Sequence, residues 1–310
     1  MKPVASVVVI SDYKVGCPLA WDDLRATLRG LALQDFSEQV EYIFLENLKH
    51  KNHIPPDLRE ILPGLKIVLT GQQLQYALKS AAANVAQADI VILLDADCVP
   101  EAAWLRRMVD MMRSQSQPAV VSGRTVYEGR NLIERCAALI DRSYVDRYSS
   151  ACTKTISNNN AAFRRAVLLA HPLPLNAGPF ASRMHAEAIM RAGGRLFFEP
   201  RARVKHSYYG WDGERDVRRH KGYARIATRR LDSSMPFARL GRLGYLSVPL
   251  MFGASLLQSW WKSLVFYRDY GIRWYQLPVL IFYAVVIHTL EIPGMIRGIH
   301  GQPITESNFR

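Results

Sequence analysis

The chain has 310 residues, of which 49% are hydrophobic and 22% charged, and its formal net charge is +13. This composition excludes a disordered chain, and the length suits one large domain or two smaller ones. The excess positive charge favours an anionic partner such as nucleic acid, anionic lipid or a phosphorylated ligand. The cysteines show no metal-binding spacing, so free thiols in a reducing compartment are expected at Cys17, Cys98, Cys136 and Cys152.

Short apolar runs alternate with helical patterns through the first hundred residues. Strands are predicted at residues 4–10, 41–45, 64–69 and 90–94, and helices at 24–34 and 74–86. This alternation is typical of an α/β fold with a mainly parallel sheet, in which ligands bind beyond the carboxyl ends of the strands. Tyr13, Glu46 and Asp97 are expected at that edge. The apolar run at 5–10 is too short for a signal peptide.

Two carboxylates, Asp95 and Asp97, follow the apolar strand at 90–94. Side chains at i and i+2 of an extended chain point the same way, so the two are expected to lie together where the strand leaves the core. Such a pair suits a hard divalent cation that leaves positions open for phosphate oxygens. Solvated acids at a strand end are the alternative interpretation, because Asp-x-Asp alone is a weak motif.

The middle of the chain is less regular. Patterns predict a strand at 119–123 and helices at 131–148 and 181–192, the latter ended by Gly193 and Gly194. Short strands are predicted at 196–198 and 202–206. Three amides, Asn158 to Asn160, precede an apolar-basic segment.

Beyond residue 200 the chain becomes basic and then apolar. Residues 201–242 hold twelve Lys or Arg against four acids, and the segments 243–261 and 277–296 each approach the ~20 residues that cross a bilayer. Prolines interrupt both segments, and His288 and Glu291 are costly in lipid. The cationic connection between them opposes the positive-inside rule for a hairpin with a cytoplasmic N-terminus. Helices lying in the membrane interface are favoured, with buried helices packed on a catalytic domain as the alternative.

Taken in order, these motifs over residues 3–230 resemble a family 2 glycosyltransferase, an inverting enzyme of the bacterial type with C-terminal membrane-associated helices. The resemblance implies a GT-A fold, Rossmann-like with a mainly parallel sheet and an Asp-x-Asp motif, at residues 1–235. A C-terminal membrane-associated helical region is expected at 236–310. The family also implies a nucleotide-sugar site. The residues expected to contact the donor are Ser11, Tyr13, Glu46, Lys79, Asp95, Arg218 and Arg219.

By the same resemblance, Asp97 is the direct ligand of Mn²⁺ or Mg²⁺, and His206 is a candidate further ligand, with a structural histidine as the alternative. Asn159 and Asn160 resemble the acceptor-side segment. Arg218 and Arg219 fall where the family often places a mobile loop that contacts the leaving group. A surface patch for anionic lipid is the other interpretation of that basic run.

One departure from the family concerns the catalytic base. Family members carry Glu-Asp at the start of the helix before Gly193, where this chain has Ala181 and Ser182. The nearest candidates for the base are His185 and Glu187. They cannot both point into one site, and either could instead be a solvated helix residue.

The resemblance thus implies transfer of a sugar, expected from a UDP-sugar, to a lipid-linked or polysaccharide acceptor of the cell envelope. The expected location is the cytoplasmic face of the inner membrane, beside anionic lipid. The main alternative is a catalytically degenerate homologue that binds a nucleotide sugar or a partner subunit. A nucleotidyltransferase is disfavoured because the first strand is not followed by a Gly-rich loop, and the sequence shows no nucleic-acid-binding motif.

Overall fold

The computed structural model describes residues 2–11, 20–72, 74–127, 129–143, 150–175, 180–208, 210–233, 235 and 237–302. Tyr13, expected at the donor site, lies outside these residues. Among them, one sheet has the strand order β3-β2-β1-β4-β8-β6-β9-β5, and β7 pairs with β9. The strands are β1 (Ala5–Ile10), β2 (Val40–Asn47), β3 (Lys66–Thr70), β4 (Ile90–Asp95), β5 (Cys98–Pro100), β6 (Val120–Tyr127), β7 (Ala151–Cys152), β8 (Asn160–Arg164) and β9 (Leu196–His206).

The first half of the sheet is parallel, as the alternating pattern predicts. β1 pairs in parallel with both β2 and β4, so that Ile10 lies level with Leu45 and Asp95. β8 is antiparallel to β4 and β6, whereas β6 and β9 are parallel. The strands predicted separately at 196–198 and 202–206 are one strand, β9. The pairing of β9 with β6 shifts its register between Gly123 and Arg124 of β6, opposite the residues that separate the two predicted strands.

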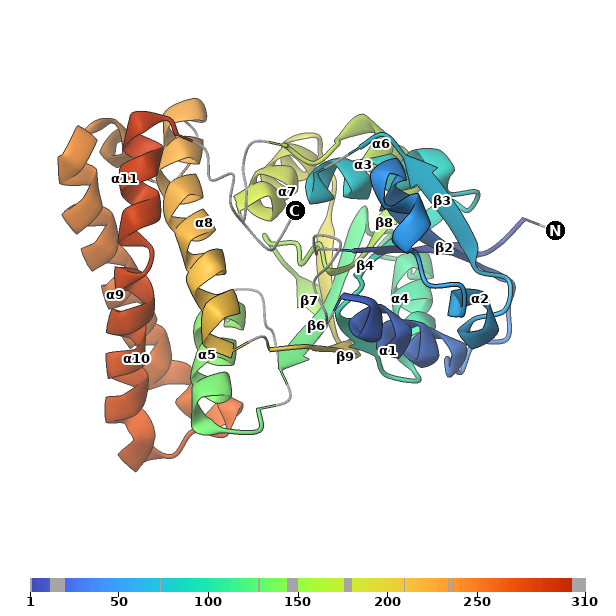
Figure 1. The fold of residues 1–310 in the computed structure, drawn as a ribbon, viewed down its shortest axis with the longest axis horizontal. Coiled ribbons are helices and arrows are strands. Elements are labelled where there is room, and N and C mark those ends of the chain that lie inside the picture. The colour runs from blue at the N-terminus through green and yellow to red at the C-terminus, as the bar shows by residue number, and fades with distance from the viewer. Residues whose placement is uncertain are drawn as a thin grey trace.

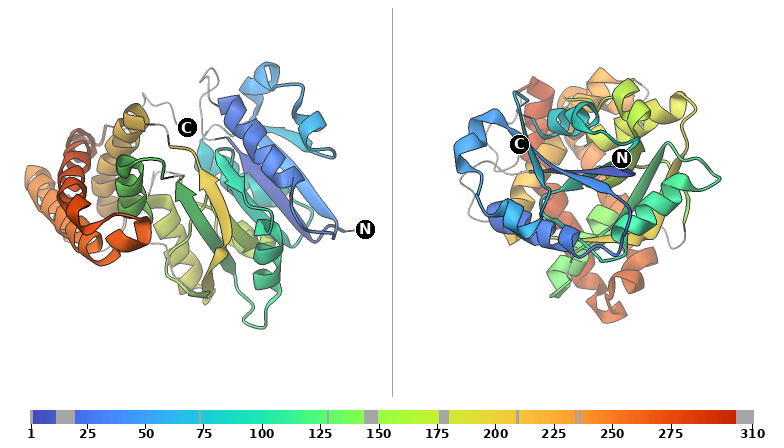
Figure 2. Two further views of the ribbon diagram at one scale, coloured as in Figure 1. Left: turned by 90° about the horizontal axis from the view of Figure 1, so that it is seen from below. Right: turned by 90° about the vertical axis from the view of Figure 1, so that its right-hand side faces the viewer.

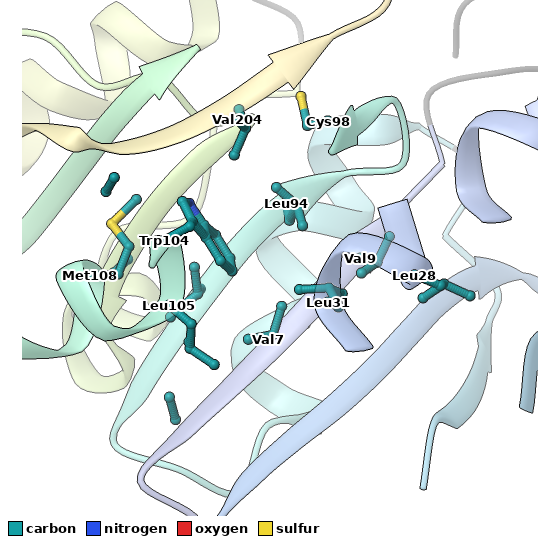
Figure 3. Packing of buried hydrophobic residues seen from close by; sticks show 14 of the residues in the cluster. Val7, Val9, Leu28, Leu31, Leu94, Cys98, Trp104, Leu105, Met108 and Val204 are labelled. Carbon is teal, nitrogen blue, oxygen red and sulfur yellow. The ribbon is translucent and has the colours of Figure 1, made fainter. Parts of the chain in front are cut away.

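Helices cover both faces of the sheet (Figure 1). One face packs against α1 (Ala20–Ala32), α2 (Leu58–Ile61) and α4 (Trp104–Arg113). The buried side chains of this layer include Leu28, Leu31 and Trp104, which meet Val7 and Leu94 of the sheet (Figure 3). The other face packs against α3 (Gln75–Val85), α6 (Arg165–Ala170) and α7 (Ala181–Arg191). Continuous burial of β1 and β4 follows from this coverage, because a parallel sheet with helices on both faces has no solvated side.

A group of helices stands beside the β6–β9 end of the sheet (Figures 1 and 2). It contains α5 (Leu132–Arg142), α8 (Gly210–Leu231), α9 (Ser247–Phe266), α10 (Leu277–Thr289) and α11 (Ile292–His300). The described part of the helix predicted at 131–148 is α5, which ends at Arg142, and residues 144–148 lie outside the described residues. The basic run that was expected near a leaving-group loop lies within the long helix α8. Pro278 and Pro293 occupy the first turns of α10 and α11, where the missing N–H costs nothing.

The helices α8 and α11 approach each other through glycines. A Cβ atom at Gly294 would collide with the carbonyl oxygen of Arg219 and lie 2.8 Å from the backbone nitrogen of Tyr223. A Cβ atom at Gly222 would collide with the backbone of Glu291. The basic helix therefore packs directly on the apolar C-terminal helices, and the predicted boundary between 235 and 236 stays a prediction.

The substitution Gly294→Ala is expected to lower the free energy of unfolding by about 1–3 kcal/mol, because the backbones of α8 and α11 must separate to admit the methyl group. Gly253, in α9, is the matched control, since no atom lies within 4 Å of a Cβ built there. Gly253→Ala is expected to be neutral or slightly stabilising through helix propensity. Thermal unfolding of both variants makes the comparison, and an equal response at the two positions would contradict the close packing.

Candidate active site

The Asp-x-Asp motif lies at the carboxyl edge of the parallel strands, as predicted. Asp95 ends β4, level with Ile10 of β1, so Ser11 and Glu46 follow the same sheet edge on the neighbouring strands. Asp95 and Asp97 are both nearly buried, 4% and 2% exposed. Buried carboxylates require partners, because desolvation of an unpaired charge is costly.

Lys79 is the partner of Asp95. Its Nζ lies 2.7 Å from Oδ1 of Asp95, and both side chains are almost fully buried. The helix α3 places Lys79 there by packing its alanine-rich face on the sheet, with Ala82 and Ala83 in the core. The expected donor-site residues Lys79 and Asp95 thus form one buried ion pair.

His206 is the partner of Asp97, although the two are more than one hundred residues apart. The short strand β5 pairs antiparallel with the end of β9, so that Cys98 lies opposite His206. This pairing brings His206 Nε2 to 3.2 Å from Oδ2 of Asp97. The backbone oxygen of Ser207 is 2.6 Å from Nδ1 of the same imidazole, which leaves Nε2 on the side of Asp97.

A metal ion fits these side chains. Three possible ligand atoms lie within 4.8 Å of one another, one each from Asp97, Cys98 and His206. Carboxylate and imidazole suit Mn²⁺, and Mg²⁺ is commonly held by one or two carboxylates together with substrate phosphates. Cys98 was not predicted. Its thiol lies 3.6 Å from Oδ1 of Asp97, and only the β5–β9 pairing indicates its place.

A cavity of about 310 Å³ opens in front of these residues. Its wall is shared between the sheet edge, α3, α5, α7 and α8. Figure 2 shows how α5 and α8 stand beside the sheet. Predicted site residues on its wall are Lys79, Asp95, Asp97, Asn159 and His206.

The two acceptor-side amides have different environments. Asn159 lines the cavity, and its Oδ1 accepts a hydrogen bond of 2.7 Å from Ser157. Asn160 is fully buried, and its Oδ1 accepts a hydrogen bond of 2.8 Å from the indole of Trp104. The neighbouring Asn158, which was not among the predicted site residues, also lines the cavity and donates to Ser182 over 3.0 Å.

The predicted bases lie away from this wall. Ser182 lines the cavity at the start of α7, but His185 and Glu187 are not among its described lining residues. His185 is 1% exposed, stacks on Phe163 and has Nε2 2.7 Å from the carbonyl oxygen of His171. Burial lowers its pKa to about 4. Glu187 pairs with Arg183 over 3.1 Å along the surface of α7.

Arg218 belongs to a buried ionic cluster and does not line the described cavity wall. Its guanidinium is 1% exposed, contacts Glu214 at 2.5 Å and Asp141 at 2.9 Å, and lies 3.6 Å from Glu291. Arg219 is also absent from the described wall, whereas Lys221 is present and reaches Asp141 over 2.5 Å.

Two carboxylates on the cavity wall, Asp141 and Glu214, were not predicted. The four-residue spacing of Glu214 and Arg218 on a helix was the available signal for their ion pair. Burial disfavours ionised Asp141, but Arg218 and Lys221 outweigh it and hold its pKa well below the ordinary value. Burial raises the pKa of Glu214, and Asp141 adds to this rise while Arg218 opposes it.

A mainly parallel sheet with an Asp-x-Asp motif at its edge, a histidine beside that motif and a cavity in front defines a GT-A glycosyltransferase that uses a nucleotide sugar. The family model described as "Glycosyl transferase family 2" matches residues 8–171. The chain therefore belongs to glycosyl transferase family 2, whose GT-A enzymes transfer sugar from a nucleotide sugar with a divalent metal.

A solved structure supports the same fold over almost the whole chain. The mannosyltransferase PcManGT from Pyrobaculum calidifontis, in complex with GDP-Man and Mn²⁺, is similar with a TM-score of 0.61 at 16% identity. The similarity covers 98% of this chain and 89% of that one, so it extends to the C-terminal helices. No curated protein matches the chain.

Proposed function

We propose that this enzyme transfers a sugar, with inversion, from a UDP-sugar to a lipid-linked or polysaccharide acceptor at the cytoplasmic face of the inner membrane. The observation that carries the transfer reaction is the shared cavity, in which Asp97 and His206 face the same space as the ion pair of Lys79 and Asp95. UDP is favoured by the resemblance of Glu46 to the family's base- and ribose-reading position. GDP is the alternative, because the mannosyltransferase PcManGT binds GDP-Man.

Asp97 and His206 would hold the divalent ion, with Asp95 oriented beside them by Lys79. When bound, the ion supplies positive charge to the diphosphate of the donor as a Lewis acid. Lys221, which lines the same cavity, places an ammonium group there, paired with Asp141. These fixed charges favour departure of the nucleoside diphosphate because they are organised before the reaction begins.

Glu214 is our candidate for the base that the sequence lacks at Ser182. Four carboxylates line the described part of the cavity: Asp95, Asp97, Asp141 and Glu214. Asp95 and Asp97 are engaged at the metal site, and the pKa of Asp141 is lowered by its cations. The pKa of Glu214 is raised, which makes its carboxylate the better proton acceptor.

In the proposed step, the oxygen of an acceptor hydroxyl attacks the anomeric carbon while Glu214 accepts the proton of that hydroxyl. The bond from that carbon to the diphosphate oxygen breaks, and the nucleoside diphosphate leaves with the bonding electrons. Arg218 positions the carboxylate through its Nε, 2.5 Å from Oε1.

The test of the transfer function is nucleotide release from a panel of UDP- and GDP-sugars by the full chain in detergent, first with Mn²⁺ or Mg²⁺ and then with EDTA. Release from one donor, abolished by EDTA, is the expected result and identifies the sugar. Absence of metal-dependent nucleotide binding and of release with every donor would contradict the proposal.

Contact with the membrane is supported by an exposed apolar surface on α9 and α10. Leu257, Trp261 and Phe282 are 64–68% exposed, and Trp274 just before α10 is 73% exposed. A run from Trp274 to His300 is long and apolar enough to cross a membrane, but 44% of its most apolar window is buried in the protein. Glu291, within this run, is held by Arg225 over 2.8 Å. Helices that lie in the membrane interface agree with both observations, because the exposed aromatics contact the lipid while the ion pair stays inside the protein.

The double variant Trp261→Ser and Trp274→Ser is expected to bind vesicles of phosphatidylcholine and phosphatidylglycerol at least about tenfold more weakly, because two large apolar groups no longer leave water. Leu33→Ser is the control, since Leu33 is 73% exposed and directly follows α1, which packs on the sheet. Co-sedimentation measures both. Unchanged binding by the double variant would contradict contact through α9 and α10.

A further inference from the structure

A second cavity, of about 390 Å³, lies between the end of β6, α5 and the end of α9. We call it the arginine cavity, because four of its described lining residues are Arg124, Arg135, Arg142 and Arg203. Its described lining contains a single acid, Asp269. The excess of guanidinium over carboxylate groups makes the described part of the wall positive, and guanidinium forks match phosphate oxygens in geometry as well as charge.

The arginine cavity adjoins the active-site cavity. Tyr127 and Arg142 line both of them. The guanidinium of Arg142 lies 5.5 Å from the centre of the Tyr127 ring. The same ring packs edge-on against the His206 imidazole, with 5.3 Å between the two ring centres. A single aromatic side chain therefore stands between the proposed metal ligand and the arginine-lined space.

Two of the four arginines contact the framework around them. Nη1 of Arg135 donates a hydrogen bond of 2.7 Å to the carbonyl oxygen of Gly271, which follows η5 (Tyr267–Tyr270). Nε of Arg203 lies 3.5 Å from Glu101, a long contact. Because a guanidinium carries five N–H donors, these contacts leave further donor directions at both side chains.

Two aromatic residues beside Asp269 also line the arginine cavity and connect it to the exposed surface of α9. Phe266 and Tyr270 line the cavity, and the preceding Leu264 and Val265 are 56% and 47% exposed. A positive pocket beside an exposed apolar face suits a ligand with an anionic head and an apolar tail.

We propose that the arginine cavity binds the phosphate head of an amphiphilic acceptor, whose apolar chain lies along α9. This inference rests on the proposed function, and it gives the acceptor a chemical class: a lipid-linked saccharide whose phosphate is held beside the active site. The saccharide would reach the active-site cavity past Tyr127 and present its hydroxyl there, and the tail would stay with the membrane.

The test measures binding of citronellyl phosphate, a short lipid phosphate, to the full chain in detergent, beside citronellol and inorganic phosphate. Arg135→Gln and Arg124→Gln are each expected to weaken citronellyl phosphate binding at least tenfold, while citronellol binding stays unchanged. Arg135→Lys is expected to recover part of the loss, because it restores the charge. Arg113→Gln is the control, since Arg113 pairs with Glu38 on the surface of α4.

Two results would overturn the inference. Wild-type affinity for citronellyl phosphate in both glutamine variants would remove the arginines from the site. Equal affinity of the wild type for inorganic phosphate and citronellyl phosphate would show an anion site without a lipid. Metal-dependent nucleotide binding and release are measured on the same samples. If the proposed function is wrong, the wild type shows neither of them. If only this inference is wrong, the wild type keeps both. Thermal unfolding of each variant separates weakened binding from misfolding.

Discussion

Asp97→Asn is expected to lower metal-dependent nucleotide release by at least about 100-fold, because it removes the carboxylate charge that would hold the ion against the donor diphosphate. The amide keeps the shape of a side chain that is 2% exposed and 3.2 Å from His206, so the fold is expected to persist. Release is measured against Mn²⁺ concentration at saturating donor. The loss is expected to appear both as lower turnover and as weaker metal binding.

A matched substitution at the same sheet edge tests the specificity of that result. Asn159→Ala removes a neutral side chain from the cavity wall and is expected to change metal affinity much less than Asp97→Asn does. Unaltered metal affinity in Asp97→Asn would place the metal elsewhere. Thermal unfolding of both variants shows whether a loss of activity follows a loss of folded protein.

Glu214→Gln is expected to lower transfer to the acceptor by about 10²–10⁴-fold while donor binding stays unchanged, since a general base contributes to the step and not to nucleotide affinity. The amide retains an oxygen for the Arg218 Nε–H, and Arg218 keeps its contacts with Asp141 and Glu291. Single-turnover transfer and calorimetric donor binding measure the two quantities separately.

The pH dependence gives the same residue a second test. A base acts only when it is deprotonated, so transfer is expected to decline as the pH falls through the pKa of Glu214. That pKa is raised above the ordinary 4.5 by burial, so the acidic limb is expected above the range of an exposed glutamate. The limb should disappear in Glu214→Gln.

Glu187→Gln decides between the two glutamates. Wild-type transfer in this variant, with loss in Glu214→Gln, assigns the base to α8. The reverse result assigns it to α7 and contradicts our proposal. His185→Gln is less informative, because His185 is buried against Phe163 and its loss would disturb packing.

The local pattern of the chain was sufficient for the parallel strands β1 to β4 and for the edge that carries the site, whereas β5, β7 and β8 were not predicted. Val7, Val9 and Leu94 belong to continuous apolar runs that only a covered parallel strand buries fully, and these runs predicted β1 and β4. The position of Asp95 and Asp97 could be predicted from the same run, because the end of a strand fixes where the next side chains leave the core. The order of the motifs along the chain predicted the family, because each motif is a short pattern that can be read without the tertiary structure.

Pairing between distant segments decided the rest. His206 reaches Asp97 because β5 and β9 pair, a contact between strands whose separation in sequence leaves no periodic signal. Glu214 and Asp141 reach the cavity because glycine contacts dock α8 on α11 and an ionic cluster joins α8 to α5.

The sequence by itself therefore determined the α/β sheet, the acidic edge and the family, since these depend on short-range periodicity and on motifs in chain order. The tertiary structure alone decided which side chains complete the cavity and which predicted ones do not line it. The physical reason is that strand pairing sets the position of His206, whereas burial, ion pairing and helix docking set the position and protonation of Glu214 and Arg218, and all of these depend on segments remote in sequence.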